Sequence, residues 1–256
     1  MTARAIARHP SANFGDGLTS AGLGAPNYAL ACRQHAAYCD ALRRAGMNVT
    51  VLDADTRHPD AHFVEDVAVI VRERATLTRP GAPSRRREVQ AMRAPLAQCF
   101  ASVDEIVAPG TLDGGDVCDA DDRIFIGISA RTNEDGARQL ARIAEHAGKR
   151  ASLVDIRSSP GLLHLKSAMA YIGENRFVAT EEAIALLDVP RERIIVVSAD
   201  EAYGANCVRV NDVVLVASAH PQLHADLSHA GFATMALDIT EFRKMDGGLS
   251  CLSLRF

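Results

Sequence analysis

Five residues with chemically useful side chains recur at matching places along the sequence. Each stands at the start of a short apolar segment that is predicted to be a strand: Asp66, Asp116, His164, Asn206 and Cys251. A cysteine and a histidine can act as a nucleophile and its proton partner, because a nearby imidazolium raises the fraction of reactive thiolate. The histidine also needs a hydrogen-bond partner that sets its tautomer. Asp113 and Asp116 are both candidates for that partner. Taken singly, each of the five has a structural explanation, so it is the combination that predicts a site.

A second group consists of three nearby acidic residues, Asp60, Glu65 and Asp66, of which two directly follow Phe63 and Val64. Carboxylates buried without a partner repel one another, so we expect a cation between them. A lysine would be a structural partner, whereas a guanidinium would be a substrate. A metal ion is a third option, but the spacing matches neither a calcium loop nor a histidine-rich zinc site. We therefore expect no metal.

Arginines supply the opposite charge at Arg79, at Arg85–Arg87 and at Arg131. Arginine can bind a carboxylate through two parallel hydrogen bonds. Acidic and basic groups together suit a small zwitterionic substrate, with a guanidinium at one end and an α-carboxylate at the other. Consecutive arginines are a weak signal for nucleic acid here, because no aromatic residue lies among them and the chain has no Trp.

The elements that must position these residues form a weak internal repeat. In residues 115–156 and again in 205–239, a strand, an Asp-Asp or Asn-Asp turn and a second strand precede a helix and a third strand. The same order fits residues 66–107, with a helix over about 84–99, and residues 164–197, with a helix over 181–187. The fifth unit is split, because its first strand is residues 251–256 and its other parts lie within residues 3–52.

A repeat that is cut by both termini suits a closed ring, in which the last strand pairs with the first unit. We therefore predict one α/β domain over residues 1–256, a five-bladed propeller of ββαβ units closed by the C-terminal strand. The alternative is an open α/β sheet whose alternating strands and helices only imitate a repeat. Pseudo-symmetry would bring the five strand-start residues to one end of the central axis, where a site is plausible.

Composition excludes several classes of protein. With 48% hydrophobic and 23% charged residues in 256, the chain has the make-up of a folded globular protein. A net charge of −4 gives no basic field for nucleic acid or anionic membrane. No apolar stretch is long enough to span a bilayer, the N-terminus is not a signal peptide, and the six cysteines form no C-x-x-C pair. We expect a cytoplasmic protein with a small-molecule substrate, and a homodimer stays open.

Seven segments together resemble the dimethylarginine dimethylaminohydrolase family: Asp16–Ser20, Phe63–Asp66, Thr78–Gly81, Leu112–Val117, Ser129–Asn133, His164–Lys166 and Met245–Cys251. They occur in the family's order and span almost the whole chain. The wider superfamily, which includes arginine deiminases and amidinotransferases, shares a five-bladed α/β propeller. That fold agrees with the ring inferred from the repeat.

The resemblance implies hydrolysis of asymmetric dimethylarginine or monomethylarginine to citrulline and a methylamine, without a cofactor. It implies that Cys251 is the nucleophile, that His164 is the general acid and base, and that Asp113 matches a position held by Glu in some bacterial relatives. It also implies that the carboxylates of Asp60, Glu65 and Asp66 lie near the guanidinium of the substrate. Arg85 and Arg131 would bind its α-carboxylate. Leu18 and Met245 would contact its α-amino end. The loop of Leu18 could act as a lid.

Two other functions stay open. An arginine deiminase-like enzyme would act on another guanidine, but deiminases typically carry His-x-Asp where this chain has His164-Leu165-Lys166, and they usually contain a helical insertion. A non-catalytic binding protein on the same propeller would not require a cysteine, a histidine and carboxylates at coincident repeat positions.

Overall fold

The computed structural model describes residues 3–159 and 161–256. The chain divides into two compact units. The first unit combines Met1–Val64 with Asn206–Phe256, and the second unit is Glu65–Ala205. The single domain over residues 1–256 stays a prediction. Among the described residues, no helix is long and apolar enough to cross a membrane.

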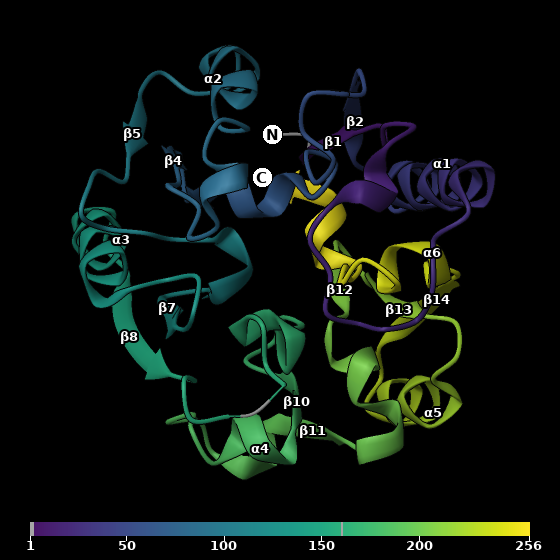
Figure 1. Cartoon of the computed structure of the whole chain (residues 1–256). Coiled ribbons are helices and arrows are strands. Elements are labelled where there is room, and N and C mark those ends of the chain that lie inside the picture. The colour runs from purple at the N-terminus through teal and green to yellow at the C-terminus, as the bar shows by residue number, and fades with distance from the viewer. Residues whose placement is uncertain (1–2, 160) are drawn as a thin grey trace. The chain divides into compact units, whose positions relative to one another are not determined.

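The second unit contains three sheets of three strands each (Figure 1). One sheet consists of β3 (Ala68–Val71), β4 (Arg74–Leu77) and β5 (Val103–Glu105). The next consists of β6 (Val117–Ala120), β7 (Arg123–Ile128) and β8 (Arg150–Asp155). The third consists of β9 (Met169–Tyr171), β10 (Phe177–Thr180) and β11 (Ile194–Val197).

The first unit contains two more sheets. One consists of β12 (Val208–Val210), β13 (Val213–Ala217) and β14 (Ala233–Leu237). The other consists of β15 (Ser253–Arg255), β1 (Arg4–Arg8) and β2 (Asn48–Leu52). In this sheet Ile6 of β1 lies opposite Leu254 of β15. The predicted pairing of the last strand with the first repeat unit is therefore confirmed.

All five sheets follow one pairing rule. The first two strands of each repeat pair antiparallel, and the middle strand pairs parallel with the third. A parallel pair needs a crossover connection, and a helix supplies it in every repeat. These helices are α1 (Tyr28–Arg44), α2 (Gln90–Ala97), α3 (Glu134–His146), α4 (Glu181–Ile184) and α5 (Pro221–His229). The repeats confirm the predicted α/β fold class of five ββαβ units.

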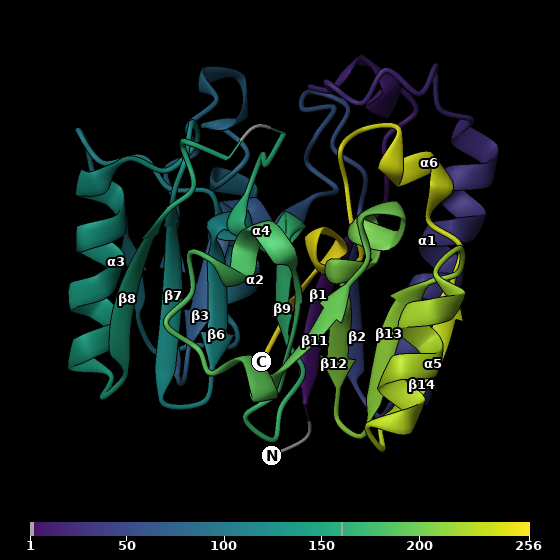
Figure 2. The ribbon, with the colours of Figure 1, turned by 90° about the horizontal axis from the view of Figure 1, so that it is seen from below.

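Local sequence signals explain where the longer helices begin and end. Asn27 precedes α1 and Asn133 precedes α3, and each side chain accepts a hydrogen bond from a backbone N–H of the first turn. Gly46 and Gly148 follow these helices with φ of 92° and 77°, which suits glycine. Figure 2 shows α3 running alongside β7 and β8, and the apolar face of the helix packs there with Leu140 fully buried.

The predicted helix over residues 84–99 is too long. Residues 83–85 form a short 3₁₀ turn, and α2 begins only at Gln90. Backbone bonds across this region join residues three apart, from Arg85 N–H to Ala82 O at 3.1 Å and from Glu88 N–H to Arg85 O at 3.0 Å. Tertiary contacts of the Arg85 side chain, described below, hold this tighter winding. A helix named α6 (Thr240–Arg243) also precedes the C-terminal segment.

The strand boundaries next to the candidate residues are also wrong in the sequence prediction. Asp66 and Cys251 lie inside 3₁₀ turns, and Asp116 ends one. His164 directly precedes such a turn, and Asn206 directly follows one. In every repeat the first strand begins after this turn rather than at the polar residue. A tight turn at that point directs short polar side chains away from the alternating pattern of a strand.

Candidate active site

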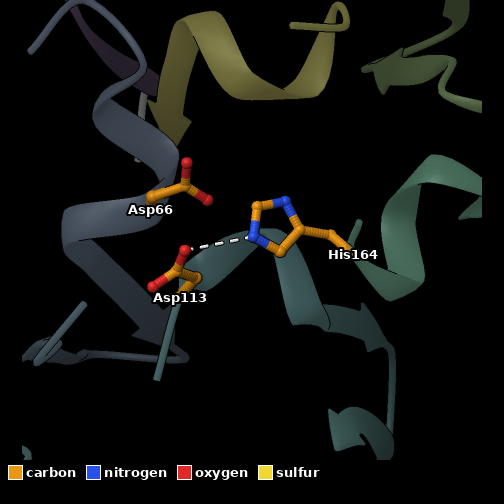
Figure 3. Close-up of side chains that lie close together, drawn as sticks. All are labelled: Asp66, Asp113 and His164. Atoms are coloured by element: carbon orange, nitrogen blue, oxygen red, sulfur yellow. Dashed lines mark hydrogen bonds and ion pairs between the residues drawn. The ribbon is translucent and has the colours of Figure 1, made fainter. Parts of the chain in front are cut away.

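His164 and Asp113 form a buried hydrogen-bonded pair in the second unit. The Nε2 atom of His164 lies 3.1 Å from Oδ2 of Asp113, and both side chains are almost fully buried. Figure 3 shows the Asp113 carboxylate on one edge of the imidazole ring and Asp66 beside it. The other oxygen of Asp113 accepts the N–H of Gly81 at 2.9 Å. Because the carboxylate is fixed by this second bond, it can hold the imidazole in one orientation.

Two glycines allow this close packing. A Cβ atom on Gly115 would lie 2.6 Å from Nδ1 of His164, and one on Gly114 would lie 2.0 Å from the carbonyl oxygen of Glu65. Neither distance is tolerable for a side chain. The two glycines of the Asp-Gly-Gly-Asp segment therefore allow the His164 imidazole and the backbone of Glu65 to pack directly against the backbone of this segment.

The surroundings of His164 keep its imidazole protonated. Burial lowers the pKa of His164, but the negative charge of Asp66, the hydrogen bond to Asp113 and the charge of Asp116 outweigh it. Together they raise the pKa to about 9, against an ordinary value of 6.5. At neutral pH the ring is therefore a cation that can donate a proton.

Asp116 holds the backbone next to the histidine rather than its ring. Its Oδ1 atom accepts the N–H of Leu165 at 2.9 Å, and its Oδ2 atom accepts the hydroxyls of Ser129 and Thr132, both at 2.6 Å. Burial raises the pKa of Asp116, and the charge of His164 and the hydrogen bonds of Asp116 only partly offset this. Of the two carboxylates left open by the sequence, Asp113 is thus the one on the His164 ring.

Asp66 is held between a backbone group and a buried arginine. Its Oδ1 atom accepts the N–H of Gly115 at 2.9 Å, and its Oδ2 atom pairs with Arg85 at 2.5 Å. Burial alone would raise the pKa of Asp66, but His164 and Arg85 outweigh it and lower the pKa below the ordinary value. Arg85 also bonds Glu88, a residue that the sequence analysis did not identify, at 2.8 Å. The Arg85 guanidinium is therefore already engaged by two protein carboxylates.

Glu65 has an oppositely charged side-chain partner, whereas Arg131 has none among the described residues. Glu65 is buried and pairs with Nζ of Lys166 at 2.5 Å, so it has the structural lysine partner that the sequence left as one option. Arg131 is partly buried, and no side chain in residues 3–159 or 161–256 pairs with its guanidinium. Arg131 is thus a cation of this unit that is available to an anionic group.

In the first unit, Asp60 fixes the loop that carries Leu18. The backbone N–H of Leu18 donates to both carboxylate oxygens of Asp60, at 3.1 and 3.2 Å. A Cβ atom on Gly17 would lie 2.3 Å from the same carboxylate, so glycine is needed for this approach. The Leu18 side chain is 42% exposed. This arrangement suits a loop that is anchored at its base and open to solvent at its tip.

Cys251 and Met245 lie in the C-terminal segment of the first unit. Cys251 is partly buried in a 3₁₀ turn over residues 250–252, and the N–H of Gly248 points to its sulfur at 3.4 Å. Met245 is buried, and the next residue, Asp246, accepts hydrogen bonds from the backbone and hydroxyl of Ser20. The sequence analysis did not identify Asp246 as a contact of the Leu18 loop.

The structure brings together only part of the predicted site. Glu65, Asp66, Arg85, Asp113 and His164 form one cluster in the second unit, with Arg131 on a loop beside Gly81. The residues Leu18, Asp60, Met245 and Cys251 belong to the first unit. That the sulfur of Cys251 faces the His164 imidazole therefore stays a prediction.

The three side chains of Asp66, Asp113 and His164 could hold a metal ion by their geometry. Their nearest ligand atoms all lie within 4.8 Å of one another. A histidine ligates a metal only as the neutral imidazole, so an ion would have to displace the proton that the same carboxylates stabilise. The chemistry that this arrangement favours directly is proton donation by the His164 imidazolium.

Comparison with known proteins places this chain in a family. A family model of eukaryotic N,N dimethylarginine dimethylhydrolases matches residues 25–248. The dimethylarginine dimethylaminohydrolase of Pseudomonas aeruginosa is 40% identical over 252 residues, which cover 98% of each chain. The protein of the same name from Streptomyces coelicolor is 35% identical over 254 residues, 98% of this chain and 96% of that protein.

Solved structures agree with the sequence matches. The Pseudomonas aeruginosa protein, in a cysteine-to-serine variant complexed with citrulline, has a TM-score of 0.96 at 39% identity over 100% of both chains. The N-terminal domain of ArgZ, an arginine dihydrolase from cyanobacteria, has a TM-score of 0.90 at 19% identity, covering 100% of this chain and 97% of that one, and shares the fold. With full-length relatives well above 30% identity, the chain belongs to the dimethylarginine dimethylaminohydrolase family.

Proposed function

We propose that this chain hydrolyses asymmetric dimethylarginine and monomethylarginine to citrulline and dimethylamine or methylamine. One observation carries the proposal: a buried, protonated His164 surrounded by carboxylates, in a chain that matches a dimethylarginine dimethylaminohydrolase over 98% of its length. A solved relative is complexed with citrulline, the product expected here. A cytoplasmic location and a homodimer remain predictions from the sequence.

Acidic residues would bind the guanidinium end of the substrate. Asp66 is ionised because Arg85 and His164 favour its charged form, and Glu65 is matched by Lys166. Ionised carboxylates offset the cost of removing a guanidinium from water and fix its orientation. In this proposal Asp60, Glu65 and Asp66 orient the cation for attack.

The other end of the substrate needs an anion site and contacts for its α-amino group. Arg131 can grip the α-carboxylate, since no described acidic side chain occupies its guanidinium. Arg85 is proposed for the same carboxylate, although Asp66 and Glu88 already engage it. Backbone carbonyls of Leu18 and Met245 are proposed to receive the α-amino group.

In the first chemical step, the thiolate of Cys251 adds to the central carbon of the guanidinium and forms a carbon–sulfur bond. The bond from that carbon to the methylated nitrogen then breaks. Its electron pair stays on nitrogen, and the protonated His164 supplies the proton, because an amide-like anion cannot leave. The amine departs, and a cationic thiouronium remains on Cys251.

In the second step, the neutral His164 takes a proton from water while the oxygen adds to the same carbon. The carbon–sulfur bond breaks, the Cys251 thiolate is restored, and the extra proton of the resulting urea passes to solvent. Asp113 keeps the imidazole oriented for both transfers through the 3.1 Å hydrogen bond. Side chains of this chain and one water suffice for the sequence of steps.

A direct test is a citrulline assay with asymmetric dimethylarginine, monomethylarginine and arginine side by side. We expect turnover of the methylated substrates, and Cys251→Ser and His164→Ala should each reduce it by about a thousandfold or more because each removes a reacting group. Cys32→Ser is the matched control, since Cys32 is also partly buried and lies in α1. Full activity in Cys251→Ser or in His164→Ala would contradict the mechanism.

The same assay separates the alternatives. Turnover of arginine in preference to both methylated substrates would identify a deiminase-like enzyme. No turnover of any guanidine, with intact folding by circular dichroism, would favour a non-catalytic protein.

A further inference from the structure

A single buried amide side chain clamps the residue that directly precedes Cys251. The Oδ1 atom of Asn206 accepts the backbone N–H of Ser250 at 2.9 Å, and its Nδ2 atom donates to the Ser250 hydroxyl at 3.0 Å. Both side chains are buried, at 8% and 2% exposed. Two bonds from one planar amide to one residue fix its position and its orientation.

The same amide also lies against Gly248. A Cβ atom on Gly248 would lie 2.4 Å from Oδ1 of Asn206 and 2.5 Å from its Cγ atom. Glycine is required here for this close approach of the backbone. The Asn206 side chain therefore contacts both residue 248 and residue 250, which lead into Cys251.

The Gly248–Cys251 turn aims a hydrogen-bond donor at the cysteine sulfur. The N–H of Gly248 lies 3.4 Å from Sγ of Cys251, and the N–H of Cys251 returns to the carbonyl of Gly248 at 3.3 Å. A donor directed at sulfur stabilises the thiolate more than the thiol. Whether the Gly248 N–H keeps that direction depends on the backbone that Asn206 holds.

We infer that Asn206 is a positioning residue for the nucleophile, which acts by holding the Gly248–Cys251 turn so that the Gly248 N–H stabilises the thiolate. This role rests on the proposed function for the identity of Cys251 as nucleophile. The sequence analysis placed Asn206 at a repeat position and gave it no role of its own. It follows that the fourth repeat supplies a support for the chemistry rather than a reacting group.

The test measures the thiol itself, without substrate. Alkylation of Cys251 by iodoacetamide is followed by peptide mass spectrometry from pH 5 to pH 10. In Asn206→Ala, we expect the rate at neutral pH to fall about tenfold and the midpoint of the pH profile to rise by about one unit, because the thiolate loses an aligned donor. With substrate, kcat should fall and KM should stay near the wild-type value.

Gln34→Ala is the matched control. Gln34 is a buried amide of the same unit that makes the same two kinds of bond, to the N–H of Glu241 at 3.0 Å and the hydroxyl of Thr240 at 2.8 Å. We expect Gln34→Ala to lower the melting temperature and leave the alkylation profile of Cys251 unchanged. Equal shifts of the profile in both variants would show a general loss of structure and overturn the proposal.

A milder variant covers the case in which Asn206→Ala fails to fold. Ser250→Ala removes the hydroxyl bond and keeps the N–H bond, so its alkylation midpoint should shift in the same direction by less. An unchanged profile in folded Asn206→Ala, or in Ser250→Ala when the first variant does not fold, would refute the role of Asn206. Because alkylation needs no substrate, a failure of the proposed function would appear separately, as wild-type protein without citrulline formation.

Discussion

His164 carries its proton at neutral pH because carboxylates surround it, even though the ring is buried. Its folded pKa of about 9 lies above the ordinary value of 6.5, so protonation stabilises the folded chain fully below about pH 6.5. This contribution is lost as the pH rises through about 9. At the scale of the residue, the group that is proposed as the acid is therefore also a source of stability.

Replacing Asp113 by Asn should move the pH at which His164 loses its proton. The variant keeps the side-chain shape but removes a negative charge and an ionic hydrogen bond at 3.1 Å. We expect the pKa of His164 and the alkaline limb of the citrulline assay to fall by about one unit. A histidine NMR titration measures the pKa, and Asp155→Asn, at an exposed ion pair with Arg157, is the control. An unshifted titration in Asp113→Asn would contradict this account.

The sequence predicts the residue types of the second-unit cluster but not their pairing. Asp113 and Asp116 flank the same two glycines, so spacing alone does not decide which one contacts His164. The tight turn of Gly114 and Gly115 decides it, by directing one carboxylate to the ring and the other to the N–H of Leu165. Glu88 was missed for a similar reason, because its role depends on the winding of the chain around Arg85.

At the scale of the element, the 3₁₀ turns before the first strands are the feature that the sequence did not show. Each turn spans only a few residues, and a short apolar run has the same pattern whether it continues a strand or begins after a turn. The repeat positions of Asp66, His164 and Cys251 were visible, whereas their local conformation was not. Tertiary hydrogen bonds such as Asp116 to Leu165 N–H select the turn.

The loop that carries Leu18 is attached to the first unit by hydrogen bonds at both ends. Asp60 accepts the N–H of Leu18, Asp246 accepts the N–H of Ser20 at 2.6 Å, and Glu241 accepts the N–H of Asn27 at 2.6 Å. Gly22 and Gly24 between these attachments have φ of 63° and 82°, and a Cβ atom on either would meet only open space. The loop is thus held at its ends by polar contacts, and the segment between them is open.

Asp246→Gly should release this loop. Asp246 has a φ of 58°, which glycine adopts without strain, so the substitution removes the carboxylate and leaves the backbone relaxed. We expect hydrogen exchange at the Ser20 amide to accelerate by about tenfold, since a bond to an ionised acceptor is lost. Asp246→Asn keeps an acceptor oxygen and tolerates this φ, and it should stay close to the wild type. Equal protection in wild type and Asp246→Gly would show that other contacts hold the loop.

At the scale of the whole molecule, the five-sheet architecture could be predicted from the sequence because one pattern of strands and helix occurs five times. Each occurrence is weak, since its strands are only three to six residues long. Agreement among five copies, and a fifth copy divided between the termini, made the pattern specific. The division into two compact units could not be predicted from the sequence, because no change in composition marks Val64 or Asn206.

Removal of residues 253–256 should destabilise the first unit strongly. The deletion eliminates β15 and its pairing with β1, the buried side chain of Leu254, and the 2.7 Å hydrogen bond between Ser253 and Tyr38. We expect the free energy of unfolding to fall by about 3 kcal/mol or more. Tyr38→Phe removes only the hydroxyl bond and should cost about 1 kcal/mol. Urea denaturation measures both, and a truncated chain with the wild-type midpoint would disprove the role of β15.

The order of the two units along the chain has a consequence for protein synthesis. The second unit is continuous from Glu65 to Ala205, so all of its residues leave the ribosome while the first unit still lacks Asn206–Phe256. Domains generally fold as they emerge, so His164 and its carboxylates can assemble early. The thiol of Cys251 is translated after the whole of the second unit, because Cys251 follows Ala205 in the sequence. A nascent chain that has not yet reached Cys251 therefore contains the proposed acid without the proposed nucleophile, and we expect it to be inactive.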